Sequence, residues 1–331
     1  MNFSLIICTY MRDEPLLKLL WSVKEQTSYP NEIIIIDGSS NDKTEKILKQ
    51  NYFENLKYYK IKAKDRGLTK QRNYGINLVS KSSEVICFLD DDIILTSNYF
   101  NNLLKTYNDY PDALAVGGYI INEVNWQKGE KTKNINQFYF DGWERSEPSR
   151  YKLRRKFGLQ PDTPPAFLPT FAHGRSVGFL PPSGKIYKVE QIMGGVSSYK
   201  KEVFKTLKFS TYFEGYGLYE DTDFSLRIAK QGSLYINTSA QLSHHHDNSG
   251  RPNKFKYGKM VVRNGWYVWR VKYASPNFKS RIKWHLTVLL LTIVRFTNIF
   301  TTKHKKEALT ETLGRAVGWL SLLFNSPKFK S

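Results

Sequence analysis

The sequence has 331 residues, of which 40% are hydrophobic and 15% aromatic, and it carries a formal net charge of +20 at pH 7. This length and apolar content suit one large domain or two of ordinary size, and they exclude a globally disordered chain. The two cysteines, Cys8 and Cys87, each lie inside an apolar run, which excludes a disulfide framework or a cysteine-rich zinc site and fits a reducing compartment.

The first part of the chain alternates apolar runs with amphipathic stretches. It has no basic leader before its first apolar run, so we expect no secretory signal. The apolar runs predict strands at 3–9, 32–38, 56–62 and 84–90, and the stretches between them predict helices at 16–26, 41–50 and 68–80. Continuous apolar strands separated by helices indicate an α/β fold with a mostly parallel sheet covered by helices on both faces. Ligands bind such sheets at the carboxyl ends of the strands, where Thr9, Asp37 and Asp90 lie.

Regular periodicity fades between residues 122 and 190. This region contains Pro- and Gly-rich segments, and aromatic residues recur among its charges. A loop-rich segment this long is usually functional or forms a subdomain. Regular patterns return at 194–207, at a predicted helix over 220–232 and at the strand that follows it.

The last quarter of the chain is basic. From Arg251 to Ser331 there are 17 Lys and Arg against two acidic residues, a net charge of +15. Such an excess indicates nucleic acid, anionic lipid or a phosphorylated substrate as the partner, or else a solvated basic face. The stretch 284–300 is apolar but is interrupted by Arg295 and Asn298, so we favour a helix in the membrane interface, with a buried core helix and a spanning helix as alternatives. We therefore divide the chain into a domain over 1–255, with an insertion over 122–190, and a basic amphipathic helical tail over 256–331.

The segment "VICFLDDDIIL" (85–95) places three carboxylates directly after an apolar strand. Adjacent carboxylates at the mouth of a sheet suit a hard divalent cation, Mg²⁺ or Mn²⁺, although a helix cap is the simpler interpretation. Asp37 also ends a strand, and "KDRGLTKQRNYG" (64–75) supplies four Lys and Arg that could bind phosphates. The absence of a glycine-rich phosphate loop argues against kinases and NAD enzymes.

Taken together, the ordered motifs resemble a known family. "SLIICTYMRDEPLLKLLWSV", "EIIIIDGSSND", "GLTKQRNYGI", "VICFLDDD", "GGVSSYKKEVF" and "GYGLYEDTDFSLR" are similar to the successive motifs of inverting family 2 glycosyltransferases with the GT-A fold, of the bacterial or archaeal polysaccharide and glycolipid type. The resemblance covers about residues 3 to 250. The region after residue 255 is only weakly similar to the basic, membrane-associated tails of some members.

The resemblance implies roles for individual residues. The nucleotide-binding set consists of Thr9, Asp37, Arg66, Arg72, Asp90 and Asp91. Asp92 and Asp90 match the acids at the metal, which would be Mn²⁺ or Mg²⁺. Of the three histidines His244, His245 and His246, we prefer His244 as a further metal ligand, with His246 second.

The resemblance also indicates where the sugars bind. Asp221 matches the catalytic base, while Gly194, Gly195 and Glu220 would face the acceptor and the donor sugar. A single base without a second nucleophile predicts inversion of configuration, whereas a hydrolase would instead use a carboxylate pair flanking the bond.

These features predict metal-dependent transfer of a sugar from a nucleotide sugar, with UDP favoured, to a glycan or lipid-linked acceptor. The expected location is the cytoplasmic face of the membrane, at an anionic surface, with no nucleic-acid partner. Two alternatives remain open: a sugar nucleotidyltransferase, and a non-enzymatic nucleic-acid-binding protein, which the net charge would suit.

Overall fold

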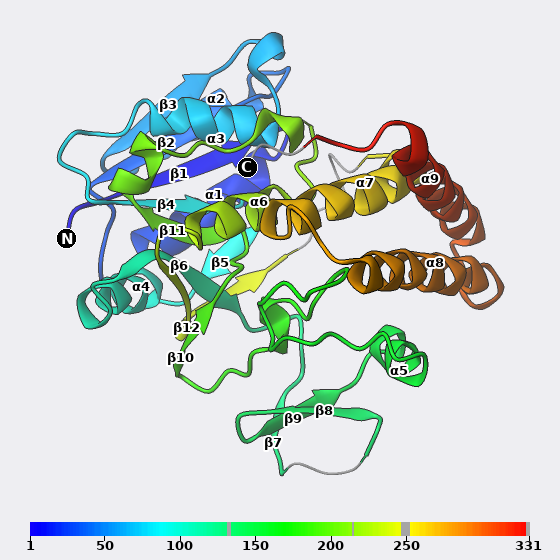
Figure 1. The fold of residues 1–331 in the computed structure, drawn as a ribbon. Helices are drawn as coiled ribbons and strands as arrows, with labels where there is room; N and C mark the ends of the chain where they lie inside the picture. Colours follow the sequence, from blue (N-terminus) through cyan, green and yellow to red (C-terminus); the bar gives the residue numbers. More distant parts are fainter. Residues whose placement is uncertain (131–133, 214, 246–251, 329–331) are drawn as a thin grey trace. The chain divides into compact units, whose positions relative to one another are not determined.

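The computed structural model describes residues 1–130, 134–213, 215–245 and 252–328 (Figure 1). The chain forms two compact units, each built from two separate segments. The first unit contains Met1–Asn125 and Pro182–Arg251, and the second contains Trp126–Pro181 and Pro252–Ser331. The region that we expected as an insertion thus groups largely with the C-terminal helices.

A large mixed sheet forms the centre of the first unit. Among the described residues it has nine strands, in the order β10-β12-β6-β11-β4-β1-β2-β3, with β5 paired to β12. The strands are β1 (Phe3–Thr9), β2 (Glu32–Asp37), β3 (Leu56–Lys60), β4 (Val85–Leu89), β5 (Ile93–Leu95), β6 (Ala113–Ile120), β10 (Ile186–Val189), β11 (Val196–Lys200) and β12 (Ser233–His244). The strands β4, β1, β2 and β3 run parallel, whereas β11 lies antiparallel between β4 and β6.

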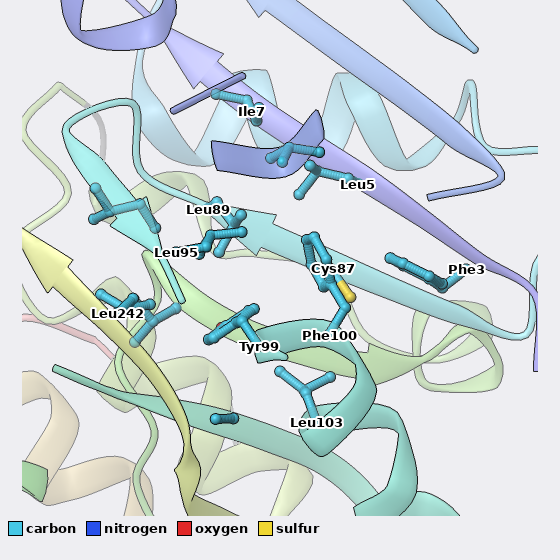
Figure 2. Packing of buried hydrophobic residues seen from close by; sticks show 14 of the residues in the cluster. Phe3, Leu5, Ile7, Cys87, Leu89, Leu95, Tyr99, Phe100, Leu103 and Leu242 are labelled. Atoms are coloured by element: carbon cyan, nitrogen blue, oxygen red, sulfur yellow. The ribbon is translucent and has the colours of Figure 1, made fainter. Parts of the chain in front are cut away.

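Helices cover both faces of this sheet. They are α1 (Asp13–Lys24), α2 (Lys43–Gln50), α3 (Leu68–Ile76), α4 (Tyr99–Asp109) and α6 (Glu220–Ile228). Successive residues of a strand point to opposite faces, so Leu5 and Ile7 join the core cluster that includes α1 and α4 (Figure 2), while Ile6 packs against Gly75 of α3. The alternation explains why the strands are apolar along their whole length.

The second unit combines a small sheet with helices. Its elements are β7 (Gln127–Lys128), β8 (Gln137–Phe140), β9 (Trp143–Ser146), α5 (Ser149–Lys156), α7 (Lys254–Lys272), α8 (Phe278–Thr301) and α9 (Lys305–Phe324). The side chains of Asn253 and Asn277 cap α7 and α8 by accepting backbone N–H bonds. Helices α7 and α9 approach closely at Gly258, where an added Cβ would lie 2.2 Å from the Glu311 carbonyl oxygen. Within this unit, the Trp269 indole donates to the Thr170 carbonyl at 3.0 Å, so α7 packs on the preceding loop.

The strands and helices predicted over the first 90 residues are all present, most with shorter ends. The sequence did not indicate α4 or β6, and it did not indicate that β11 inserts antiparallel into the parallel order. The described residues also form four short 3₁₀ helices: Ala63–Asp65, Val177–Phe179, Lys201–Lys205 and Thr211–Phe213.

Candidate active site

The three consecutive aspartates after β4 each have a different environment. Asp90 continues the pairing of β4 with β11, because its backbone N–H donates to the Gly195 carbonyl at 2.9 Å. Its side chain is 44% exposed and lies 3.6 Å from Nη2 of Arg72. Asp91 and Asp92 are buried. Only Asp90 is therefore open to an incoming ligand without rearrangement.

Arg12, in the loop after β1, holds the two buried aspartates. Its Nη1 lies 3.0 Å from Asp91 Oδ1 and 3.2 Å from Asp92 Oδ2. The Thr9 hydroxyl donates to the other oxygen of Asp91 at 2.7 Å. Burial raises the pKa of the Asp91 carboxyl to about 7, and Arg12 and Thr9 oppose that shift. Arg12 was not among the residues predicted from the sequence, although a cation shortly after a strand end was a usable signal.

His244 ends β12 and contacts Asp92. Its Nε2 lies 3.1 Å from Asp92 Oδ1, and its Nδ1 lies 2.9 Å from Glu123 Oε1. Hydrogen bonds to Asp92 and then to Glu123 raise the pKa of His244 to about 10. A carboxylate on the second ring nitrogen is also the usual partner of a metal-binding histidine. No sequence pattern indicated Glu123.

The other two histidines differ from His244. The His245 backbone N–H donates to the Asp92 carbonyl at 2.8 Å, and its ring lies 3.2 Å from the Ser243 hydroxyl. His246, our second choice, lies outside the described residues. Among the candidates that the structure describes, His244 is the one whose ring touches an aspartate of the site.

Arg72 of α3 lies next to Asp90 and Glu220. It is almost fully buried, forms an ion pair with the buried Glu220 of α6, and has its guanidinium carbon 5.3 Å from the ring centre of Phe209. Burial raises the pKa of the Glu220 carboxyl to about 8, and Arg72 opposes the shift. Arg72 therefore contacts Glu220 and approaches Asp90, and its burial leaves little of it open to a ligand.

Two glycines bring the remaining acids close to the backbone. A Cβ on Gly195 would lie 2.0 Å from Asp90 Oδ2, and one on Gly194 would lie 2.5 Å from Glu220 Oε1. The Gly194 N–H donates to Asp221 Oδ2 at 3.2 Å. Asp90 and Asp221 are therefore held against adjacent residues of one chain segment.

Asp221 lies in the first turn of α6. Its Oδ1 accepts the Thr222 N–H at 2.7 Å, and its side chain is partly exposed, unlike that of Glu220. A helix N-terminus stabilises an ionised carboxylate. Asp221 can therefore accept a proton from a bound hydroxyl.

The other predicted nucleotide-binding residues lie nearer β1 and β2. Asp37 is fully buried; its oxygens accept the Ser39 N–H at 2.7 Å and the Tyr58 hydroxyl at 2.8 Å. Burial, and then the hydrogen bond to Asp37, raise the pKa of the Tyr58 hydroxyl. The Arg66 guanidinium lies over Tyr10, 5.8 Å from its ring centre. Asp37 thus has both oxygens engaged within the protein.

The donor set suits a divalent cation only in part. The part of the chain that the structure describes contains no ready group of three or more His, Cys, Asp or Glu side chains arranged to hold a metal ion. Asp92 and His244 are already in contact, and this carboxylate and imidazole pair suits Mn²⁺. Asp90 lies beside Arg72 and is close enough to Asp92 and His244 to interact with both electrostatically. These residues fit a metal whose remaining ligands come from phosphate oxygens and water.

Comparison with known proteins agrees with this geometry. The model described as glycosyl transferase family 2 matches residues 4–174, just over half of the chain, and a model described as the N-terminal domain of galactosyltransferase matches residues 175–246. The glucosyl-dolichyl phosphate glucuronosyltransferase of Haloferax volcanii is 29% identical over 125 residues, which are 37% of this chain and 39% of that protein. The chain thus aligns with less than half of that relative.

Solved structures show the fold. The S. aureus TarS structure covering residues 1–349 has a TM-score of 0.52 and 14% identity, over 97% of this chain and 80% of that one. The structure titled GalNAc-T7 with UDP, GalNAc and Mn2+ has a TM-score of 0.53 and 16% identity, over 86% and 53%. The GT-A fold predicted from the sequence is confirmed.

Proposed function

Because the chain belongs to glycosyl transferase family 2, we propose that it transfers a sugar from a nucleoside diphosphate sugar to a hydroxyl group with inversion of configuration. One observation carries the proposal: the adjacent residues Gly194 and Gly195 hold Asp221 and Asp90 side by side. The acid assigned to the donor and the acid assigned to the acceptor therefore lie against neighbouring residues at the carboxyl edge of the parallel strands.

The donor diphosphate would lie near Asp90, Asp92 and His244. These residues would hold Mn²⁺ or Mg²⁺, which when bound neutralises the charge of the leaving diphosphate. The structure titled with UDP and Mn2+ shares the fold and supports this choice. The base and ribose would lie toward Thr9, Asp37 and Arg66. We favour uridine as the base. Asp91 would support this part of the site through its hydrogen bond with Thr9 and its ion pair with Arg12.

Asp221 would act as the general base. It accepts the proton of the acceptor hydroxyl while that oxygen attacks the anomeric carbon, and the bond from this carbon to the diphosphate oxygen breaks on the opposite face. Two backbone N–H donors orient the Asp221 carboxylate. Glu220 is the rival base, but its carboxylate is buried and paired with Arg72, so it has less reach to an acceptor.

The acceptor would be a glycan or a lipid-linked sugar, because the Haloferax relative is named for a glucosyl-dolichyl phosphate. The location would be the cytoplasmic face of a membrane with an anionic surface. By length and composition alone, α8 is the one helix within the described residues that could cross a membrane. We propose peripheral rather than spanning attachment.

The test is a panel of UDP-, dTDP- and GDP-sugars, measured for donor hydrolysis and for transfer to lipid-linked and soluble acceptors. We expect a UDP-sugar to be consumed with release of UDP. Release of pyrophosphate would instead identify a nucleotidyltransferase. Oligonucleotide binding without any donor hydrolysis would favour the nucleic-acid alternative.

Asp221→Asn is the decisive variant in that panel, with Glu220→Gln as its neighbour for comparison. Asp221→Asn keeps the shape but not the basicity, so donor binding should survive while transfer falls roughly 10²–10⁴-fold. Normal turnover by Asp221→Asn together with a folded but inactive Glu220→Gln would reverse the assignment.

A further inference from the structure

Helix α8 exposes a continuous apolar stripe. Seven large apolar side chains, each between 36% and 78% exposed, recur at intervals of three or four residues: Phe278, Ile282, Leu286, Leu289, Ile293, Phe296 and Phe300. At 3.6 residues per turn they fall within an arc of about 80°. Folded soluble proteins rarely leave so many large apolar groups aligned in water.

Helix α9 repeats the pattern. Its exposed apolar residues, again spaced by three or four positions apart from the final pair, are Leu309, Leu313, Val317, Leu320, Leu323 and Phe324. These two helices contain half of the exposed large apolar side chains of the described chain. Exposed large apolar side chains are therefore concentrated in α8 and α9.

The opposite side of α8 is packed on protein. Trp284 is fully buried, and its ring lies 4.8 Å from that of Trp266 on α7. In the most apolar window of α8, only 17% is buried, so the helix is not a core helix. One side of α8 thus packs within its own unit, whereas the side chains of the stripe are exposed.

An ion-pair cluster argues that α8 does not span a bilayer. The buried Glu311 of α9 has one carboxylate oxygen 2.9 Å from Arg295 Nε of α8 and the other 2.8 Å from Arg315 Nη2. If α8 spanned the bilayer, Arg295 and its partner Glu311 on α9 would lie toward the hydrocarbon core. Charged groups there are energetically costly. A helix lying in the interface keeps the cluster on the protein side.

Cations accompany both stripes. Residues 278–324 contain eight Lys and Arg and two acidic residues, a net charge of +6. Exposed cations lie in the first turn of α8 at Lys279 and Arg281, in the connection to α9 at Lys303, and in the first turn of α9 at Lys305 and Lys306. Both acids are engaged: Glu311 as above, and Glu307 3.3 Å from Lys254. Two copies of such a face would repel each other, whereas anionic lipid headgroups would neutralise it.

We propose that α8 and α9 bind an anionic bilayer surface in the plane of the interface, inserting the two apolar stripes while the flanking cations contact the headgroups. This deepens the membrane location given under the proposed function and rests on it. The lipid surface is also where a lipid-linked acceptor is presented.

The test is flotation of the full-length protein with vesicles of phosphatidylcholine alone or with added phosphatidylglycerol. Deleting the tail would be a poor test, because α7 packs on the loop at Thr170 within the second unit. Point variants are better: Leu286→Asp with Ile293→Asp in the stripe, and a triple change of Lys303, Lys305 and Lys306 to Gln. Tyr52→Asp is the matched control, since Tyr52 is 81% exposed in the first unit.

We expect wild type and Tyr52→Asp to float with the anionic vesicles at least about 10-fold more than with the neutral ones. The stripe variant should lose this binding and keep its thermal melt, and the Gln triple should lose the preference for anionic lipid. Wild-type binding that the stripe variant retains would overturn the proposal. Resistance of the membrane-bound wild type to carbonate extraction would also overturn it, because it indicates a spanning helix. A wild-type protein that binds no vesicles but forms a dimer, which the stripe variant does not form, would overturn it as well.

Donor hydrolysis in vesicle-free buffer separates this proposal from the proposed function. The stripe variant should hydrolyse the donor at the wild-type rate. A protein that floats but hydrolyses no donor would contradict only the enzyme assignment.

Discussion

Alanine should mainly reduce stability at Gly194 and mainly reduce activity at Gly195, although the two residues are adjacent. At Gly195 the new Cβ would lie 2.0 Å from Asp90 Oδ2. The backbones cannot separate easily, because the Asp90 N–H donates to the Gly195 carbonyl and Leu89 pairs with Val196. The 44% exposed side chain of Asp90 can swing away into solvent, so the fold survives but the acid leaves its place.

At Gly194 the new Cβ would meet two groups that have no such freedom. It would lie 2.5 Å from Glu220 Oε1 and 2.7 Å from Arg72 Nη1, and both of these side chains are buried. Overpacking of this kind costs about 1–3 kcal/mol. Gly→Ala also lowers the conformational entropy of the unfolded chain, which stabilises the folded state by about 0.4–1 kcal/mol. We expect a net loss of stability of about 1–2 kcal/mol at Gly194 and of less than about 1 kcal/mol at Gly195.

Urea denaturation and transfer kinetics together test this reasoning. Gly195→Ala should unfold near the wild-type midpoint and lose roughly 10²-fold in turnover, the effect expected when a group that positions the substrate is displaced by about 1 Å. Gly38→Ala is the comparison for milder crowding, because its Cβ would come no closer than 3.2 Å to another atom, against 2.0 Å at Gly195 and 2.5 Å at Gly194. Full activity of Gly195→Ala, or an unchanged midpoint for Gly194→Ala, would refute the steric argument.

Three further outcomes are expected. Mn²⁺ titrated calorimetrically should bind wild type at least about 10-fold more tightly than Asp92→Asn, and EDTA should abolish transfer, whereas full activity in EDTA would exclude the metal role. Burial raises the pKa of the Cys87 thiol well above its ordinary value, so a thiol reagent near neutral pH should label Cys87 only after the protein unfolds; rapid labelling of Cys87 in the native protein would contradict this. Desolvation, aided by Arg154, lowers the pKa of His173 to about 3, so below about pH 6.5 the unfolded chain binds a proton there that the folded chain does not. As the pH falls from about 6.5 to about 3, the free energy of unfolding should therefore decrease by at most about 1.4 kcal/mol per pH unit. In acid denaturation, His173→Asn should show a smaller decrease per pH unit than wild type. An equal decrease in both proteins would disprove the effect.

The sequence indicated the fold because local patterns carry it. Apolar runs such as 3–9 and 32–38 end in Thr9 and Asp37, and in a parallel sheet these ends lie at one edge. The run Asp90–Asp92 could be placed at that edge in the same way. The exposed stripe of α8 is likewise a periodic feature, although the pattern alone left a core helix and a spanning helix open.

The tertiary structure decided which partner each of these groups has. Arg12 lies about 80 residues before Asp91 and Asp92 along the chain, and Glu123 lies 121 residues before His244, so no local pattern could pair them. Arg72, which the sequence placed among phosphate-binding residues, is instead buried against Glu220, 148 residues away.

The physical reason is the difference between local and long-range interactions. Apolar periodicity acts between neighbours in the chain, so strands, helices and the sheet edge can be derived from it. The ionisation and reach of a carboxylate depend on burial and on charges that only folding brings close. The sequence therefore determined that acids gather at this edge, and only the fold made Asp91 and Glu220 buried and left Asp90 and Asp221 open.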